Sequence, residues 1–217
     1  MENIQYKCAI FDLDGVLVDT AKYHYLAWKS LAQELRFVFT LQQNEALKGV
    51  SRMKSLELLL GFGGLSGRFS QEEKEQMAEK KNRLYVEKIM CLKKDELFPG
   101  VLDFFRHLKE KGIKIALGSD SKNAPLILGH LEISGYFDTI VDGSQVSKAK
   151  PDPEVFIWAA QNLNIPCESC IVFEDSTAGL KAAKQAGMKA VGIGTPKNLP
   201  MADLVIASVD QYIPYLA

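Results

Sequence analysis

The chain has 217 residues, of which 47% are hydrophobic and 24% are charged, and its formal net charge is −1. This length suits one domain with a substantial insertion, or two small domains, around a packed core. The charge balance excludes the basic footprint of a nucleic-acid-binding protein, and no apolar stretch approaches the ~20 residues of a membrane span. The first expected strand begins within about six residues of the start, which leaves no room for a signal peptide. We therefore expect a soluble cytoplasmic protein.

Short apolar runs predict six strands, at 6–11, 113–118, 138–142, 170–173, 189–193 and 204–206. Helix-like segments alternate with them, at 101–111, 123–133, 153–163 and 176–186. Such alternation predicts an α/β fold, a Rossmann-like parallel sheet with helices on both faces. Glycines at 112, 135 and 187 are expected as left-handed ends of helices.

Residues 18–93 break this alternation. They contain helical patterns and no convincing strand, with helices expected around 22–36, 42–48, 52–61 and 70–90. The expected organisation is a core formed by 1–17 and 94–217, with an all-helical domain inserted at 18–93.

The four cysteines are Cys8, Cys91, Cys167 and Cys170. The Cys167-x-x-Cys170 spacing is compatible with half a zinc site or with a redox pair. A zinc site needs a second pair of ligands, and the three histidines, at 24, 107 and 130, do not have that spacing. We expect ordinary reduced thiols.

Two carboxylates, Asp12 and Asp14, follow the apolar run Cys8–Phe11. That run reads as a buried parallel strand, and open α/β sheets bind their ligands at the carboxyl edge of such strands. Alternate residues of an extended strand point the same way, so both carboxylates should face one side. Two carboxylates that close repel each other unless a cation or a proton shares the site. The alternative is an ordinary strand end followed by an Asp- and Gly-rich loop.

Four segments, in order, resemble the motifs of the haloacid dehalogenase-like hydrolases and phosphotransferases. They are Asp12-Leu13-Asp14-Gly15-Val16-Leu17-Val18-Asp19-Thr20, Gly118-Ser119-Asp120-Ser121, Lys150-Pro151-Asp152-Pro153 and Phe173-Glu174-Asp175-Ser176. The resemblance spans essentially the whole chain. It implies that 1–17 and 94–217 form the catalytic core and that 18–93 form the helical cap domain of this family.

The resemblance also implies roles for the core residues. Asp12 is the nucleophile that becomes an aspartyl-phosphate, and Asp14 is the general acid/base. Ser119 and Lys150 hold the transferring phosphoryl group. Mg²⁺ is bound by the Asp12 carboxylate, the Asp14 backbone carbonyl and Asp175, with Glu174 acting through water. The alternative for Glu174-Asp175-Ser176 is a plain helix N-terminus, where acidic side chains are also favourable.

Three further segments, 20–28, 47–52 and 119–123, are similar to sugar-phosphate mutases of this family. The substrate-binding residues implied are His24, Trp28, Gly49, Ser51, Arg52, Lys81, Ser121, Lys122 and Asn123. Simpler alternatives are a histidine in a helix interface, a lysine that snorkels from an apolar face, and a solvated surface arginine. Asp120 departs from the family pattern, in which this residue is small.

The reaction implied is the interconversion of beta-D-glucose 1-phosphate and glucose 6-phosphate. It needs Mg²⁺ and an aspartyl-phosphate enzyme, with beta-glucose 1,6-bisphosphate as activator and intermediate. A Mg-dependent sugar-phosphate phosphatase is the alternative, because the four core motifs do not separate the two. A binding protein that has lost catalysis should lack one of Asp12, Asp14, Lys150 or Asp175, and all four are present. The expected partner is a small-molecule sugar phosphate, without nucleic acid or membrane, and the expected state is a monomer.

Overall fold

The structure is a computed structural model that describes residues 6–47 and 51–216. The chain divides into two compact units. The core unit comprises residues 1–19 and 92–217, and the helical unit comprises residues 20–91. Among the described residues, no helix is long and apolar enough to cross a membrane.

The core unit is built on one six-stranded parallel sheet with the order β3-β2-β1-β4-β5-β6. The strands are β1 (Cys8–Phe11), β2 (Lys114–Gly118), β3 (Thr139–Val141), β4 (Cys170–Glu174), β5 (Lys189–Ile193) and β6 (Leu204–Ile206). This confirms the predicted α/β fold with a parallel sheet. The chain adds β2 and β3 on one side of β1 and then returns to place β4 on the other side. The order therefore reverses between β1 and β4, which is where open α/β sheets form a ligand-binding crevice.

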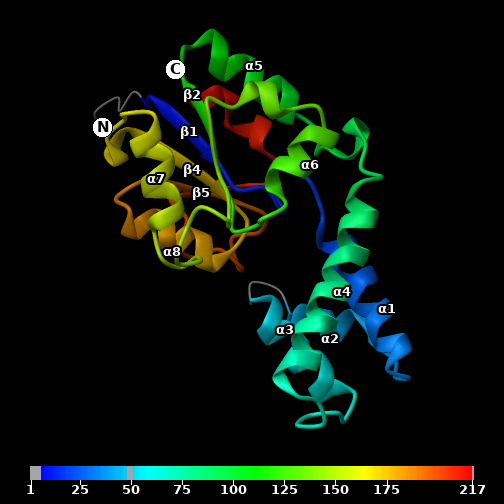
Figure 1. Cartoon of the computed structure of the whole chain (residues 1–217). Helices are drawn as coiled ribbons and strands as arrows, with labels where there is room; N and C mark the ends of the chain where they lie inside the picture. Colours follow the sequence, from blue (N-terminus) through cyan, green and yellow to red (C-terminus); the bar gives the residue numbers. More distant parts are fainter. Residues whose placement is uncertain (1–5, 48–50, 217) are drawn as a thin grey trace. The chain divides into compact units, whose positions relative to one another are not determined.

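Helices cover both faces of the sheet (Figure 1). One face packs against α7 (Glu154–Asn162) and α8 (Thr177–Gln185), with Ile10 and Val172 in the same buried cluster as Phe156 and Leu180. The other face packs against α5 (Val101–Glu110) and η4 (Val209–Tyr215). The remaining core elements are η1 (Lys94–Glu96), α6 (Ala124–His130), η2 (Ser134–Tyr136) and η3 (Cys167–Ser169).

An aromatic cluster fills the α5 side of the sheet. Phe173 on β4 stacks on Phe11 with ring centroids 4.9 Å apart. It meets Phe104 of α5 edge-on at 5.2 Å and Tyr212 of η4 at 5.3 Å. Edge-to-face aromatic pairs are favourable beyond the area they bury. The two strands that form the crevice are thus held together directly beneath it.

The helical unit contains α1 (Ala21–Glu34), α2 (Leu41–Glu45), α3 (Arg52–Phe62) and α4 (Gln71–Ile89). Thr40 and Ser70 begin α2 and α4 with complete capping boxes, which satisfy backbone N–H groups at the first turn. The four helices bury their own apolar cluster, which includes Trp28, Leu56 and Leu59.

Left-handed residues end several core helices. Gly112 (φ +69°) and Gly187 (φ +75°) have this conformation, as predicted. The prediction for Gly135 is wrong, because this residue lies inside η2 and Glu132 (φ +57°) takes the left-handed conformation after α6. Asn164 (φ +54°) does the same after α7.

The cysteines are unpaired thiols, as expected. Cys8 and Cys170 are register partners on β1 and β4 and are fully buried. Neither belongs to the group of metal-ligating side chains found among the described residues.

Replacement of Phe173 by alanine should lower the free energy of unfolding of the core unit by about 3–5 kcal/mol, because it removes a fully buried ring from the aromatic cluster. Denaturant unfolding followed by circular dichroism measures this. Met201→Ala is the control, since Met201 is 41% exposed and should change stability by less than about 0.5 kcal/mol. Equal losses in the two variants would contradict the proposed role of the cluster.

Candidate active site

The polar side chains of the core unit gather where β1, β2 and β4 end. Asp12 follows β1, and its backbone N–H donates to the carbonyl of Phe173 at 3.0 Å. Glu174 is the last residue of β4, and Ser119 directly follows β2. All three are buried, with 7%, 1% and 2% of their surface exposed. This is the crevice that the strand order creates between β1 and β4.

Lys150 binds these strand ends together. Its ammonium group donates to Asp12 Oδ1 at 2.5 Å, to Glu174 Oε1 at 2.9 Å and to the carbonyl of Gly118 at 2.9 Å. Burial alone would lower the pKa of Lys150, but the carboxylates of Asp12 and Glu174 outweigh it and raise the pKa above its ordinary value. The lysine is therefore a permanent positive charge beside Asp12.

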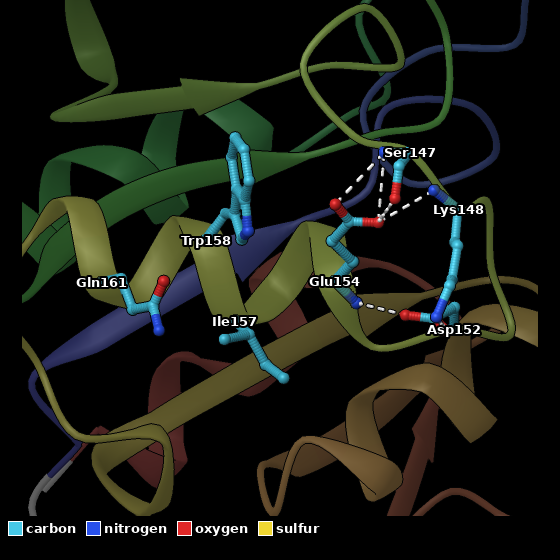
Figure 2. Close-up of a pocket in the computed structure, with 7 residues that line it drawn as sticks. All are labelled: Ser147, Lys148, Asp152, Glu154, Ile157, Trp158 and Gln161. Atoms are coloured by element: carbon cyan, nitrogen blue, oxygen red, sulfur yellow. Dashed lines mark hydrogen bonds and ion pairs between the residues drawn. The ribbon is translucent and has the colours of Figure 1, made fainter.

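The segment that carries Lys150 is anchored by the start of α7. Glu154 accepts hydrogen bonds from the backbone N–H groups of Ser147 at 3.1 Å and Lys148 at 2.8 Å (Figure 2). Asp152 accepts the N–H of Glu154 at 3.1 Å. A pocket of about 310 Å³ borders these residues together with Trp158, and none of the predicted site residues lines it.

Three carboxylates lie together at the crevice. Oxygens of Asp12, Glu174 and Asp175 are all within 4.8 Å of one another. Burial and the charge of Glu174 raise the pKa of Asp175 to about 7, and the charge of Asp14 adds to this. Burial also raises the pKa of Asp12, although Lys150 opposes the shift. Such repulsion between neighbouring carboxylates is relieved by a cation, and an oxygen-only donor set suits a hard divalent ion.

Glu174 is already held by the protein. Its Oε2 accepts from the N–H of Ser176 at 2.7 Å and from the Ser176 hydroxyl at 2.9 Å, while Lys150 binds Oε1. A Cβ at position 179 would lie 1.9 Å from Glu174 Oε1, so only glycine allows this packing. Asp175 is closely packed in the same way, because a Cβ on Gly15 would lie 2.0 Å from its Oδ2. Both oxygens of Glu174 therefore already accept hydrogen bonds within the protein.

A second pocket of about 310 Å³ opens beside Asp175. Gly15, Gly194 and Ser208 are among the residues that line it, and they follow β1, β5 and β6. The hollow thus lies at the carboxyl edge of the sheet.

The loop after β2 presents two hydroxyl groups. Ser119 Oγ accepts the N–H of Ser121 at 3.2 Å, and Ser121 Oγ accepts the N–H of Asn123 at 3.3 Å. Accepting uses a lone pair, so each hydroxyl hydrogen remains able to donate to an anion. Lys122, which follows Ser121, is exposed. The loop supplies hydroxyl donors and a positive charge close to the end of β2.

A second cluster lies within the helical unit. Lys81 is 2% exposed, and its Nζ is 2.7 Å from His24 Nδ1 and 4.6 Å from the centre of the Trp28 ring. His24 stacks on Tyr85 with ring centroids 3.9 Å apart. Burial, followed by the charges of Lys81 and Arg52, lowers the pKa of His24 well below its ordinary value. A neutral His24 can accept the hydrogen bond from Lys81.

Arg52 lies close enough to affect this cluster. It is the first residue of α3, after the N-cap Ser51, whose hydroxyl accepts the N–H of Lys54 at 3.3 Å. Its charge, after burial, contributes to lowering the pKa of Lys81 to about 7. Burial lowers the pKa of Arg52 itself, and Glu79 opposes this. The cluster therefore combines two basic groups, those of Lys81 and Arg52, beside a neutral His24, and the basic groups favour an anionic ligand. Gly49 lies outside the described residues.

The structure gives three residues of these clusters contacts that the sequence did not indicate. Tyr85 lies one helical turn after Lys81 on the same face of α4, a spacing that was a usable signal. Ser176 was expected only as a helix cap, and it also fixes the Glu174 carboxylate. Trp28 was expected to bind substrate, and the structure places it in the apolar cluster of the helical unit beneath Lys81.

The chain is similar to known proteins over most of its length. The family model of haloacid dehalogenase-like hydrolases matches residues 6–187. The chain is 45% identical to a beta-phosphoglucomutase of Bacillus subtilis (strain 168) over 92% of this chain and 88% of that protein. It is 34% identical to a phosphorylated carbohydrates phosphatase of Thermotoga maritima over 85% of this chain and 83% of that protein.

A solved structure is also similar. The crystal structure of a beta-phosphoglucomutase from Clostridium difficile aligns with a TM-score of 0.88 at 43% identity, and it covers 97% of this chain and 96% of that one. The family model covers most of the chain and includes all four motifs around the crevice. The chain therefore belongs to the haloacid dehalogenase-like hydrolase family.

Proposed function

We propose that the chain is a beta-phosphoglucomutase, which interconverts beta-D-glucose 1-phosphate and glucose 6-phosphate. One observation carries the proposal: Lys150 holds the carboxylate of Asp12 at the end of β1, beside Asp175. A fixed carboxylate paired with a permanent cation suits nucleophilic attack on phosphorus. The similarity to the mutases of B. subtilis and C. difficile supports this sugar phosphate over others.

The proposed cycle starts from enzyme phosphorylated on Asp12. The 6-hydroxyl oxygen of glucose 1-phosphate attacks this phosphorus, Asp14 takes the hydroxyl proton, and the bond from phosphorus to the Asp12 oxygen breaks. The product is beta-glucose 1,6-bisphosphate and free Asp12. Lys150 stays beside the transferring group, where its charge offsets the charge on the phosphoryl oxygens.

The second half of the proposed cycle runs in reverse on the other phosphate. The bisphosphate reorients, an Asp12 oxygen attacks the phosphorus on the 1-oxygen, and Asp14 returns its proton to that leaving oxygen. Glucose 6-phosphate departs and phospho-Asp12 is restored. Ser119 and Ser121, whose hydroxyl hydrogens can donate, bind phosphate oxygens in this scheme.

The oxygen-only cluster fits Mg²⁺, which prefers such ligands. We propose that the Asp12 carboxylate, the Asp14 carbonyl and Asp175 hold the ion, with Glu174 acting through water. When bound, the ion would offset negative charge on the phosphoryl group.

The bisphosphate has two phosphates, so a mutase needs a second anion site. We propose that Arg52, Lys81 and His24 of the helical unit bind the phosphate that is not being transferred, and that this unit acts as the cap. Trp28 and Tyr85 act through Lys81, whose Nζ lies 4.6 Å and 5.1 Å from their ring centres. Ser51, Lys122 and Asn123 complete the proposed phosphate contacts.

A sugar-phosphate phosphatase is the second candidate, and the phosphatase relative of T. maritima favours it. It would share the attack of Asp12 on phosphorus, and water would then resolve the phospho-enzyme. The greater identity to the B. subtilis mutase favours the mutase.

Product analysis separates the two. Enzyme supplied with Mg²⁺, beta-glucose 1-phosphate and a trace of the 1,6-bisphosphate should yield glucose 6-phosphate, measured with a coupled dehydrogenase. Asp12→Asn should lower turnover by several orders of magnitude and abolish the aspartyl-phosphate seen by mass spectrometry, because an amide is a poor nucleophile. Inorganic phosphate as the main product would reject the mutase, and turnover retained in Asp12→Asn would reject the nucleophile.

Arg52→Ala should lower kcat/KM for the sugar phosphate about ten- to hundredfold, the size expected for a lost charged hydrogen bond of about 1.5–3 kcal/mol. Phosphorylation of Asp12 by acetyl phosphate, which has no second phosphate, should change little. Arg83→Ala is the matched control, because Arg83 is an exposed arginine of α4 paired only loosely with Glu79, at 3.9 Å. Equal losses on both phosphate donors would argue against Arg52 as the distal phosphate site.

Lys81 should titrate near neutral pH, because burial and then the charge of Arg52 lower its pKa from 10.5 to about 7. Between these two pKa values, Lys81 is protonated in the unfolded chain and deprotonated in the folded helical unit. Its free energy of unfolding should therefore rise as the pH rises from about 7 towards 10.

The titration can be followed through Trp28, which the ammonium group faces. The chain has two tryptophans, so a Trp158→Phe background isolates the emission of Trp28. That emission should change with a midpoint near pH 7, and Lys81→Met should remove the change. An unaltered midpoint in Lys81→Met would show that another group titrates.

A further inference from the structure

Asp120 stands in the phosphate-binding loop, directly after Ser119, where the family pattern has a small residue. An acid there brings negative charge towards an anion site, which is unfavourable unless its carboxylate has another partner. The structure provides one: Asp120 Oδ2 accepts the backbone N–H of Lys150 at 3.0 Å. The carboxylate is thus bonded to the main chain of the residue whose ammonium group holds Asp12.

The main chain of Asp120 is itself fixed by close packing. A Cβ at Gly143 would lie 2.0 Å from the carbonyl oxygen of Asp120, so the loop after β3 presses directly on this residue. The N–H of Ser119 donates to the carbonyl of Val141 at 3.0 Å. The main chain of Asp120, whose carboxylate anchors Lys150, is therefore held against the ends of β2 and β3.

Lys150 is where the segment needs such an anchor. Pro151 follows it and has no N–H group, and the N–H of Asp152 bonds within the segment, to the carbonyl of Ala149 at 3.1 Å. On the other side, Glu154 holds Ser147 and Lys148, as Figure 2 shows. Glu154 ties that end to α7, whereas Asp120 ties Lys150 to the end of β2.

We propose that Asp120 is a positioning residue of this chain, which holds the main chain of Lys150 so that its ammonium group lies against Asp12. The inference deepens the proposed function and rests on it. Asp120 does not touch the phosphoryl group in this scheme, and its contribution is the hydrogen bond to Lys150.

The test uses the full chain with Mg²⁺ and acetyl phosphate. An Asp12 oxygen attacks the phosphorus, the bond from phosphorus to the acetyl oxygen breaks, and acetate leaves with the electron pair. Quenched-flow mass spectrometry gives the rate of aspartyl-phosphate formation and its dependence on acetyl phosphate concentration. Asp120→Ala should slow the maximal rate about tenfold or more, the size of one charged hydrogen bond, with a smaller change in half-saturation.

Asp120→Asn keeps an oxygen acceptor without the charge, so it should restore the rate to within about threefold of wild type, which is about 0.6 kcal/mol. The amide proton of Lys150, followed by NMR, should shift upfield and exchange faster in Asp120→Ala. Asp138→Ala is the matched control. Its carboxylate also accepts a backbone N–H, that of Ile115 at 2.9 Å, but at the start of β2. It should lower stability without slowing phosphorylation.

Three outcomes would overturn the inference: a wild-type rate in Asp120→Ala, an Asp120→Asn variant as slow as Asp120→Ala, or an equal loss in Asp138→Ala. The proposed function fails differently. Enzyme that is phosphorylated normally but releases only inorganic phosphate rejects the mutase and leaves the role of Asp120 intact. If acetyl phosphate never labels the wild-type enzyme, both the proposed function and the proposed role of Asp120 are rejected, whatever the amide shift of Lys150 shows.

Discussion

The ammonium group of Lys150 is the interaction on which the rest of the core unit depends. It lies between two buried carboxylates, those of Asp12 and Glu174, and 6% of its side chain is exposed. Buried charges are costly, and removal of one partner leaves the others uncompensated. The carboxyl ends of β1 and β4 can carry acids side by side only because this cation lies between them. The strand order therefore creates the crevice, and the charge of Lys150 offsets the repulsion between the carboxylates that line it.

The buried lysine of the helical unit, Lys81, has different surroundings from Lys150. Lys81 is buried, and aromatic rings and a histidine surround its Nζ. Burial and Arg52 therefore lower its pKa, whereas the carboxylates raise that of Lys150. A lysine without a charge partner gains most when an anion arrives. The charge of Lys150 is thus balanced by carboxylates of the protein, whereas Lys81 is the lysine that we propose binds a phosphate.

Much of the fold follows from local sequence, and much of the site does not. The strands predicted at 189–193 and 204–206 have the same bounds as β5 and β6, because short, mostly apolar runs are typical of parallel strands. Gly135 does not end the helix as expected, because α6 ends at His130 and Glu132 takes the left-handed conformation before the chain reaches Gly135. The contacts of Lys150 with Asp12 and Glu174 join residues 138 and 24 positions apart. Spacing along the chain carries no such information, so only the family resemblance indicated them.

The pairing of Lys150 with Asp12 has to be reconciled with reactivity, since a lysine that binds a nucleophile also restrains it. The remaining contacts of Lys150 resolve this. In the proposed transfer, an Asp12 oxygen turns to phosphorus, and the ammonium group would keep its hydrogen bonds to Glu174 Oε1 and to the carbonyl of Gly118. It can therefore shift its third hydrogen bond to a phosphoryl oxygen without losing its position. A cation fixed by groups that take no part in the transfer needs little reorganisation during it, which is where electrostatic catalysis is strongest.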